Sequence, residues 1–246
     1  MITPQMTGLE LAKVFRNDYP CIYAFGAKKA KVLGRELRKG FGKMAFACYD
    51  LAVNGTRYKV CIGVTPKALR HSYTVLAYVK ERNEYVNVSI VGRSTLPQFA
   101  YTTHCLKRYA ERYMKSPDAS LNAIIANIEK NIVYTIELYH DGGENHVWAN
   151  SAGLFLQKHD DKRDIRICKT FVSVEMLKTS QIAAYASVAG LIEEYSKTFN
   201  SIAPHDVYTI SKCFNQDLLR QGVTHEMLQE LYGEFFEKKQ QCLTRL

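Results

Sequence analysis

The sequence predicts an α+β protein with antiparallel hairpins in its N-terminal half, a central helix pair packed on an antiparallel sheet, and a helical C-terminus. Three observations predict this class. Residues 45–91 consist of β-rich runs around turn signals, residues 103–132 carry apolar side chains at helical spacing, and residues 179–246 are again helical in period. Hydrophobic residues make up 47% of the 246 residues, which is typical of a chain that buries a core.

The first predicted element is a short amphipathic helix over residues 7–16, because Thr7 is a suitable cap and apolar residues follow at helical spacing. Residues 27–43 are strongly basic, with seven Lys and Arg against the single acid Glu36. Two interpretations fit this segment: a solvated, partly helical connector, or a contact surface for nucleic acid. The second interpretation predicts nucleic-acid contacts at Lys28, Lys29, Lys31, Arg35 and Arg38.

Two hairpins are predicted next. Asn54-Gly55 is a strong signal for a two-residue turn between two β-rich runs. The polar residues 80–84, KERNE, would form the tip of a second hairpin. Together the hairpins predict a four-stranded antiparallel sheet with one face covered by helix, and Pro97 is expected to end this half of the chain.

A pair of helices is predicted to follow, over residues 103–115 and 119–132, with Ser116-Pro117 ending the first. Two further hairpin turns are expected at residues 150–153 and 160–164, which places an antiparallel sheet under the helix pair. The second helix carries an apolar stripe that would pack on this sheet. The stripe consists of Leu121, Ile124, Ile125, Ile128 and Ile132.

The polar side of the predicted helix 103–115 is the main candidate site. At 100° per residue, His104, Arg108, Arg112 and Lys115 gather on one side of the helix. The first turn of a helix has unpaired N–H groups that can receive an anion, and arginine matches phosphate oxygens. The alternative is an ordinary solvated side, in which Glu111 pairs with a neighbouring Lys or Arg.

The order of elements adds a resemblance. The pattern H-x-x-x-R-x-x-x-R on one helix, a following isoleucine-striped helix and a meander ending in CKTFVS is similar to the small ribonuclease toxins of the RelE and BrnT type, over about residues 100–178. The resemblance implies a helix-borne His and Arg against a curved antiparallel sheet, and a protein inhibitor of the antitoxin kind as a partner. It implies an acid or base at His104, phosphate anchors at Arg108 and Arg112, and final-strand contacts at Lys169 and Thr170.

Such a site would cleave a phosphodiester without a metal. A base removes the proton of a ribose 2′-OH, cations stabilise the phosphate, and an acid protonates the leaving oxygen. Histidine suits either proton role near neutral pH. A second proton carrier would have to be His146 or His159, approaching from the sheet.

Other candidate motifs predict less chemistry. Residues 140–146, HDGGENH, contain a Gly-Gly turn and match no metal-ligand spacing, so no metal site and no cofactor are predicted. Tyrosines in the N-terminal strands either stack bases or simply pack. The seven cysteines form no C-x-x-C pair and carry no nucleophile signature, which favours thiols in a reducing compartment.

Charge and hydropathy indicate the class of partner. The formal net charge of +9 favours anionic partners such as RNA. No signal peptide or run of 18 apolar residues is found, so a cytoplasmic protein without a membrane partner is expected. The expected organisation is an N-terminal helix and sheet (1–97), a RelE-like unit (98–178) and C-terminal helices (179–246).

Three functional hypotheses remain. The first is an RNA-binding protein whose His/Arg helix side also cuts RNA, so that the protein would be an endoribonuclease. The second is a non-catalytic nucleic-acid-binding or regulatory protein, as in a phage or mobile element. The third is an interaction protein with no nucleic-acid role. The sequence pattern does not distinguish oligomeric states.

Overall fold

The protein is α+β, as predicted, in a computed structural model. The chain divides into two compact units: unit 1 is Met1–Lys130 with His159–Thr170, and unit 2 is Asn131–Lys158 with Phe171–Leu246. Residues of the predicted segment 98–178 contribute to both units. The structure describes residues 2–40, 44–64, 71–91, 94–131, 136–140, 144–198 and 207–243.

Unit 1 begins with a long helix, α1 (Gly8–Lys39). Its predicted start is confirmed, because the Thr7 hydroxyl accepts from the Glu10 N–H and the Glu10 carboxylate accepts from the Thr7 N–H. The predicted end at residue 16 is wrong: the helix includes Pro20 and the basic segment as far as Lys39. The reason is that buried residues continue at helical spacing through Leu33 and Leu37, so packing extends the helix.

Five strands of unit 1 form an antiparallel sheet in chain order. Asn54 and Gly55 form the predicted two-residue turn, with φ angles of 48° and 78°. The short 3-10 turn η1 (Lys80–Arg82) forms the tip of the second hairpin. The strands are β1 (Ala45–Val53), β2 (Thr56–Val64), β3 (His71–Val79), β4 (Glu84–Val91) and β5 (Ser94–Thr102).

The sheet differs from the prediction at two points. Pro97 does not end the N-terminal half but lies inside the fifth strand, where it pairs with Val88. The register shifts between Val86 and Val88, so a bulge accommodates the missing N–H donor. In addition, β5 pairs in parallel with β9 (Ile165–Val172), which makes the sheet mixed rather than purely antiparallel.

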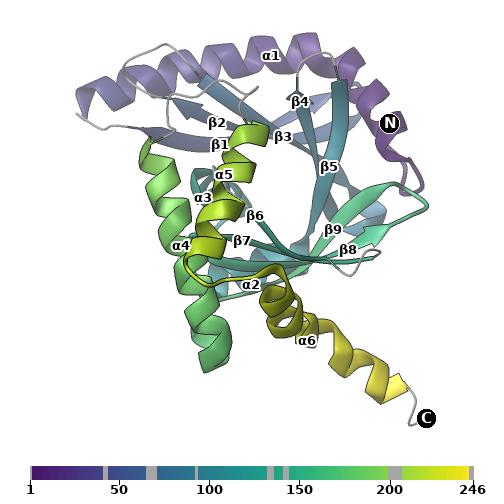
Figure 1. Ribbon diagram of the computed structural model, residues 1–246. Coiled ribbons are helices and arrows are strands. Elements are labelled where there is room, and N and C mark those ends of the chain that lie inside the picture. Colours follow the sequence, from purple (N-terminus) through teal and green to yellow (C-terminus); the bar gives the residue numbers. More distant parts are fainter. Residues whose placement is uncertain are drawn as a thin grey trace. The chain divides into compact units, whose positions relative to one another are not determined.

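Helices cover both faces of this sheet. On one face, α1 lies across the strands (Figure 1) and packs Phe15, Ile22 and Leu33 on Tyr58 and Val60. The opposite face carries α2 (Thr103–Arg112) and α3 (Leu121–Asn131). Because side chains alternate along a strand, Thr74 and Lys59 point away from α1. Thr74 hydrogen-bonds Glu129 of α3 at 2.6 Å, and Lys59 hydrogen-bonds Asn122 of α3 at 2.7 Å, which places α3 on the face opposite α1.

The two helices α2 and α3 are slightly shorter than predicted. α2 ends at Arg112, because the chain turns at Tyr113 and reaches a left-handed conformation at Lys115, with φ of 53°. The predicted stripe of α3 is confirmed as buried at Ile124, Ile125 and Ile128. Hydrogen bonds join α3 to β1, β2 and β3, however, whereas it was expected to pack on the later hairpins. Its last predicted member, Ile132, lies outside the described residues.

A buried ion pair joins three distant segments of unit 1. Arg163 donates to Glu84 at 2.7 Å, and their side chains are only 2% and 5% exposed. The backbone carbonyl of Arg163 accepts from the N–H of Gly8 at 2.7 Å, where α1 begins. The start of α1, the start of β4 and the turn before β9 are therefore held together.

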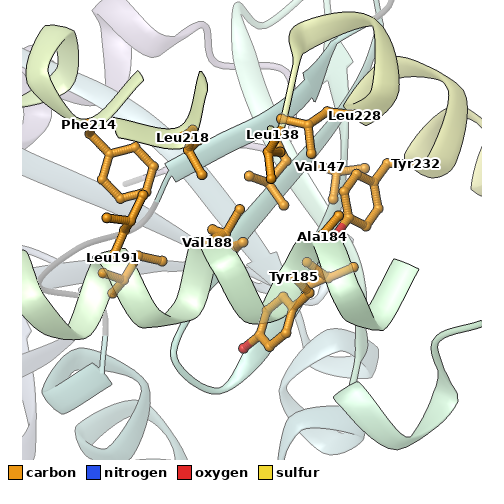
Figure 2. Packing of buried hydrophobic residues seen from close by; sticks show 14 of the residues in the cluster. Leu138, Val147, Ala184, Tyr185, Val188, Leu191, Phe214, Leu218, Leu228 and Tyr232 are labelled. Atoms are coloured by element: carbon orange, nitrogen blue, oxygen red, sulfur yellow. The ribbon is translucent and has the colours of Figure 1, made fainter. Parts of the chain in front are cut away.

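Unit 2 packs helices on antiparallel strands. The Thr224 hydroxyl caps the last helix by accepting from the Met227 N–H at 3.2 Å. Figure 2 shows Leu138 and Val147 of the strands with Leu228 and Tyr232 of that helix in one buried cluster. The elements are β6 (Ile136–His140), β7 (Asn145–Asn150), β8 (Gly153–Asp160), η3 (Val174–Met176), α4 (Thr179–Thr198), α5 (Val207–Arg220) and α6 (His225–Leu243).

β8 ends at Asp160 and β9 begins at Ile165, with the predicted turn at residues 160–164 between them. Among the described helices, none has both the length and the apolar composition needed to cross a membrane.

We predict that Ile128→Ala lowers the free energy of unfolding by about 2–5 kcal/mol, because it removes fully buried methylene and methyl groups from the centre of α3. Urea denaturation would measure the change. The control is Lys130→Ala, an exposed position on the same helix, which should change stability by under about 0.5 kcal/mol. An equally small loss for Ile128→Ala would contradict the packing of α3 on the sheet.

Candidate nucleic-acid interface

The exposed side of α1 carries a row of cations. Lys28, Lys31, Arg35 and Arg38 are all exposed and follow one another at intervals of three, four and three residues. This spacing aligns side chains along one side of a helix. The row spans ten residues, or about 15 Å at the rise of an α-helix. We call these four residues the α1 basic row.

The charges of the α1 basic row are not neutralised within the part of the chain that the structure describes. None of the four makes an ion pair there. Arg35 and Arg38 donate their Nε–H groups to the backbone carbonyls of Lys31 and Gly34, at 3.3 and 3.2 Å. These bonds use only the Nε–H groups of the two exposed arginines, so an anion can bind their terminal guanidinium nitrogens.

Lys29 differs from its neighbours, although it was predicted with them. Its side chain is half-buried, and its Nζ lies 4.9 Å from the ring centre of Tyr49 and 5.6 Å from that of Phe25. Cation–π contacts of this kind connect the helix to the first strand of the sheet. Lys29 therefore helps to hold α1 on β1.

The polar side of α2 forms a second charged surface. His104 is exposed in the first turn, after the cap formed by the Thr102 hydroxyl and the Cys105 N–H. Arg108 is bound to Glu111 at 2.9 Å, which is the pairing expected of a solvated helix side. Partial burial, and then the charge of Arg108, lower the pKa of Arg112, but an arginine stays protonated at any physiological pH.

The end of β9 lies beside the start of α2. The Thr102 hydroxyl donates to the carbonyls of Cys168 and Lys169, at 3.0 and 3.3 Å. Cys168 is buried on the α2 side, because its thiol is one of the groups that raise the pKa of Cys105, after burial. Since side chains alternate along a strand, Thr170 shares the α2 side and exposed Lys169 points toward the α1 side.

The predicted site residues are thus divided between two surfaces of unit 1. The α1 basic row lies on the exposed side of the helix that covers one face of the sheet, whereas His104, Arg108 and Arg112 lie on a helix that covers the other face. Lys115 is exposed just beyond that helix. A single ligand that contacts the row on α1 need not reach α2.

The two candidate proton carriers have other partners. His159 lies at the turn between β8 and β9, where its Nε2 is 3.6 Å from Asp161 and 3.5 Å from Asp164. This turn is at the opposite end of β9 from Lys169. In unit 2, buried His146 is bonded to Glu137 at 2.7 Å. The structure of unit 1 therefore brings no second histidine to the start of α2 among the residues it describes.

Sequence reasoning missed a polar cluster beneath α3. Cys48, Cys61 and Thr74 lie side by side on β1, β2 and β3, and the Thr74 hydroxyl donates to Glu129 at 2.6 Å. Burial raises the pKa of Glu129 to about 7, although the Thr74 hydrogen bond opposes the shift. A helical wheel could have found this residue, because Glu129 follows Ile125 by four positions and so shares the apolar stripe.

Comparison of the chain with protein-family models, with characterised proteins and with solved structures gives no match. The likeness to toxins of the RelE and BrnT type therefore stays a prediction. Within the described ranges, no group of three or more His, Cys, Asp and Glu side chains is arranged to hold a metal ion.

Glu129 predicts a pH dependence of stability. The pKa is about 7 in the folded protein against an ordinary value of 4.5, so between these values the folded state keeps a proton that the unfolded state has lost. The free energy of unfolding should therefore fall by up to about 3 kcal/mol as the pH rises from 4.5 to 7. Glu129→Gln should remove this part of the slope in urea denaturation series. A variant slope identical to that of the wild type would contradict the assignment.

Proposed function

We propose that the protein binds RNA through the α1 basic row. The observation that carries the proposal is the alignment of Lys28, Lys31, Arg35 and Arg38 on one exposed side of a helix whose other side is fixed to a sheet. Acidic residues are rare on this part of α1, where Glu36 is the only one between residues 27 and 39. The formal net charge of +9 adds a long-range attraction for polyanions.

The proposed contact is with the phosphate backbone. Lysine and arginine that neutralise phosphates release condensed counterions, so the logarithm of affinity falls linearly with the logarithm of salt concentration. Four contacts on a single strand correspond to a slope of about −3. Phosphate contacts position a nucleic acid without reading its bases, and we therefore propose binding with little sequence preference.

The double substitution Lys31→Ala with Arg35→Ala should weaken RNA binding and reduce the magnitude of the salt slope by about 1.4, because two phosphate contacts are lost. Fluorescence anisotropy with a labelled single-stranded RNA, at several salt concentrations, would measure both quantities. The fold should persist, since both side chains are exposed.

The matched control is Lys162→Ala, which removes an exposed cation from the turn between β8 and β9. It should leave the slope unchanged. Wild-type affinity and slope in the double variant would reject the α1 basic row as the binding site, and an equal loss per charge in Lys162→Ala would indicate diffuse attraction instead.

RNA cleavage at α2 is a second candidate function. The observation that favours it is the exposed His104 in the first turn of α2, with Arg108 and Arg112 one and two turns further along. In this proposal His104 transfers a proton, the arginines hold the scissile phosphate, and Thr170 contacts the substrate from β9. An endoribonuclease toxin of this kind would have an inhibitor protein as its partner. Without cleavage, the same chain would be a regulatory nucleic-acid-binding protein.

His104→Gln should then leave RNA affinity unchanged but lower the cleavage rate by about 10²–10⁴-fold, the usual contribution of a positioned proton carrier. The assay would follow a labelled RNA in chelator between pH 5 and 9. His159→Gln serves as the control, because that histidine lies at the other end of β9. Cleavage that survives His104→Gln at the full rate, or that requires a divalent metal, would remove His104 from the mechanism.

A further inference from the structure

Two cysteines face each other across the first hairpin of unit 1. Cys48 of β1 and Cys61 of β2 are directly opposed in the antiparallel register, each six residues from the turn residues Asn54 and Gly55. The residues that flank a two-residue turn, Val53 and Thr56, form a hydrogen-bonded pair, and the two kinds of pair alternate from there. Cys48 and Cys61 therefore occupy a non-hydrogen-bonded pair, in which side chains approach most closely.

This pair has the spacing of a disulfide. The Cα atoms of a non-hydrogen-bonded pair are about 4.5 Å apart, and disulfide-bonded cysteines have Cα separations of roughly 4.4–6.8 Å. The thiols are free in the structure and point to the same side of the sheet, beneath α3. Cys61 is 2% exposed, and Cys48, on the edge strand, is 9% exposed. A disulfide between them requires no change in the register of β1 and β2.

We propose that Cys48 and Cys61 form a reversible disulfide when the protein meets hydrogen peroxide, a two-electron oxidant. The Cys48 sulfur attacks the peroxide, its O–O bond breaks, and a sulfenic acid and one water are formed. The Cys61 sulfur then attacks the sulfenic sulfur, the S–S bond forms and the S–O bond breaks, and the leaving hydroxide becomes a second water with the Cys61 proton. Two thiols are oxidised by two electrons, and peroxide is reduced to two waters.

Glu129 is placed to assist the second step. A hydrogen bond with Cys48, and then burial, raise the pKa of the Cys61 thiol, so that its attack requires a proton acceptor. Thr74, directly opposite Cys61 on β3, is bonded to the Glu129 carboxyl group. The groups that face Glu129 are Cys61 from β2, Thr74 from β3 and the phenol of Tyr101 from β5. Near the start of α3, Lys59 and Asp50 are paired with each other at 2.6 Å, and both are hydrogen-bonded to Asn122.

The disulfide would tie the edge strand β1 to its neighbour and close a loop that contains the hairpin turn. Cross-links of this kind restrict the unfolded chain and raise the temperature of unfolding. The site is independent of the proposed RNA contact, since the α1 basic row belongs to the helix that covers the other face of the sheet. Failure of either proposal therefore leaves the other intact.

Peptide mapping tests the proposal on the full-length protein. Trypsin cleaves after Lys43, Arg57 and Lys59, which places Cys48 and Cys61 on separate peptides. After native protein is treated with hydrogen peroxide and remaining thiols are blocked, non-reducing mass spectrometry should show the two peptides linked and two hydrogen atoms lighter. Dithiothreitol should release them. Absence of the linked peptide under conditions that fully oxidise exposed Cys21 would overturn the proposal.

Two sets of variants separate the disulfide from general oxidation. Cys48→Ser and Cys61→Ser should each abolish the peroxide-induced rise in unfolding temperature, whereas Cys105→Ser, at another buried thiol, should keep it. In the wild type, the rate of linkage should rise with pH through about 7, as Glu129 becomes able to accept a proton. Glu129→Gln should flatten this rise. An unchanged pH profile in Glu129→Gln would overturn the role of Glu129, and linkage to any other cysteine instead would overturn the pair.

Discussion

The sheet of unit 1 is apolar on both faces, and the arrangement of the helices in this unit follows from the need to exclude water from each. Tyr58, Val60 and Ile62 require cover on one face, and Cys61 and Leu76 require it on the other. The helix α1 covers the first face along its whole length, while α2 and α3 cover the second. Because one side of α1 packs on the sheet, the four cations of the α1 basic row lie on the opposite, exposed side, whereas Lys29 contacts β1.

Because α1 and α2 cover opposite faces of the sheet, the proposed RNA contact on α1 is separate from any chemistry at α2. The α1 basic row is supported by a helix that is held at its start by Gly8 and Arg163 and in its middle by the contact of Lys29 with Tyr49. Because the backbone of α1 is already ordered in this way, phosphate contacts would not have to order it. The polar side of α2 is partly neutralised by Glu111. The α1 basic row makes no ion pair among the described residues, and the proposed RNA binding does not depend on a catalytic role for His104.

Local signals in the sequence predicted local features well. Asn54-Gly55 identified its turn and Thr7 its helix start, because both act through neighbouring backbone groups. The end of α1 was missed because the basic residues 27–43 fit a partly helical connector as well as a contact surface, although Leu33 and Leu37 continue the buried side. The pairing of β9 with β5 could not be predicted, since it joins residues more than 60 positions apart. The sequence pattern also grouped Lys169 with His104, whereas strand alternation directs Lys169 to the α1 side of the sheet and His104 lies on α2, which covers the other side.

The central claim is that RNA contacts α1 and not α2. Acetylation of lysines by an N-hydroxysuccinimide ester, with and without bound RNA, tests it at single residues in the unmodified sequence. Lys28 and Lys31 of α1 should react more slowly when RNA is bound, while Lys107 of α2 and Lys162 of the turn before β9, which are also exposed, should react at unchanged rates. Protection of Lys107 with unchanged reactivity at Lys28 and Lys31 would contradict the account.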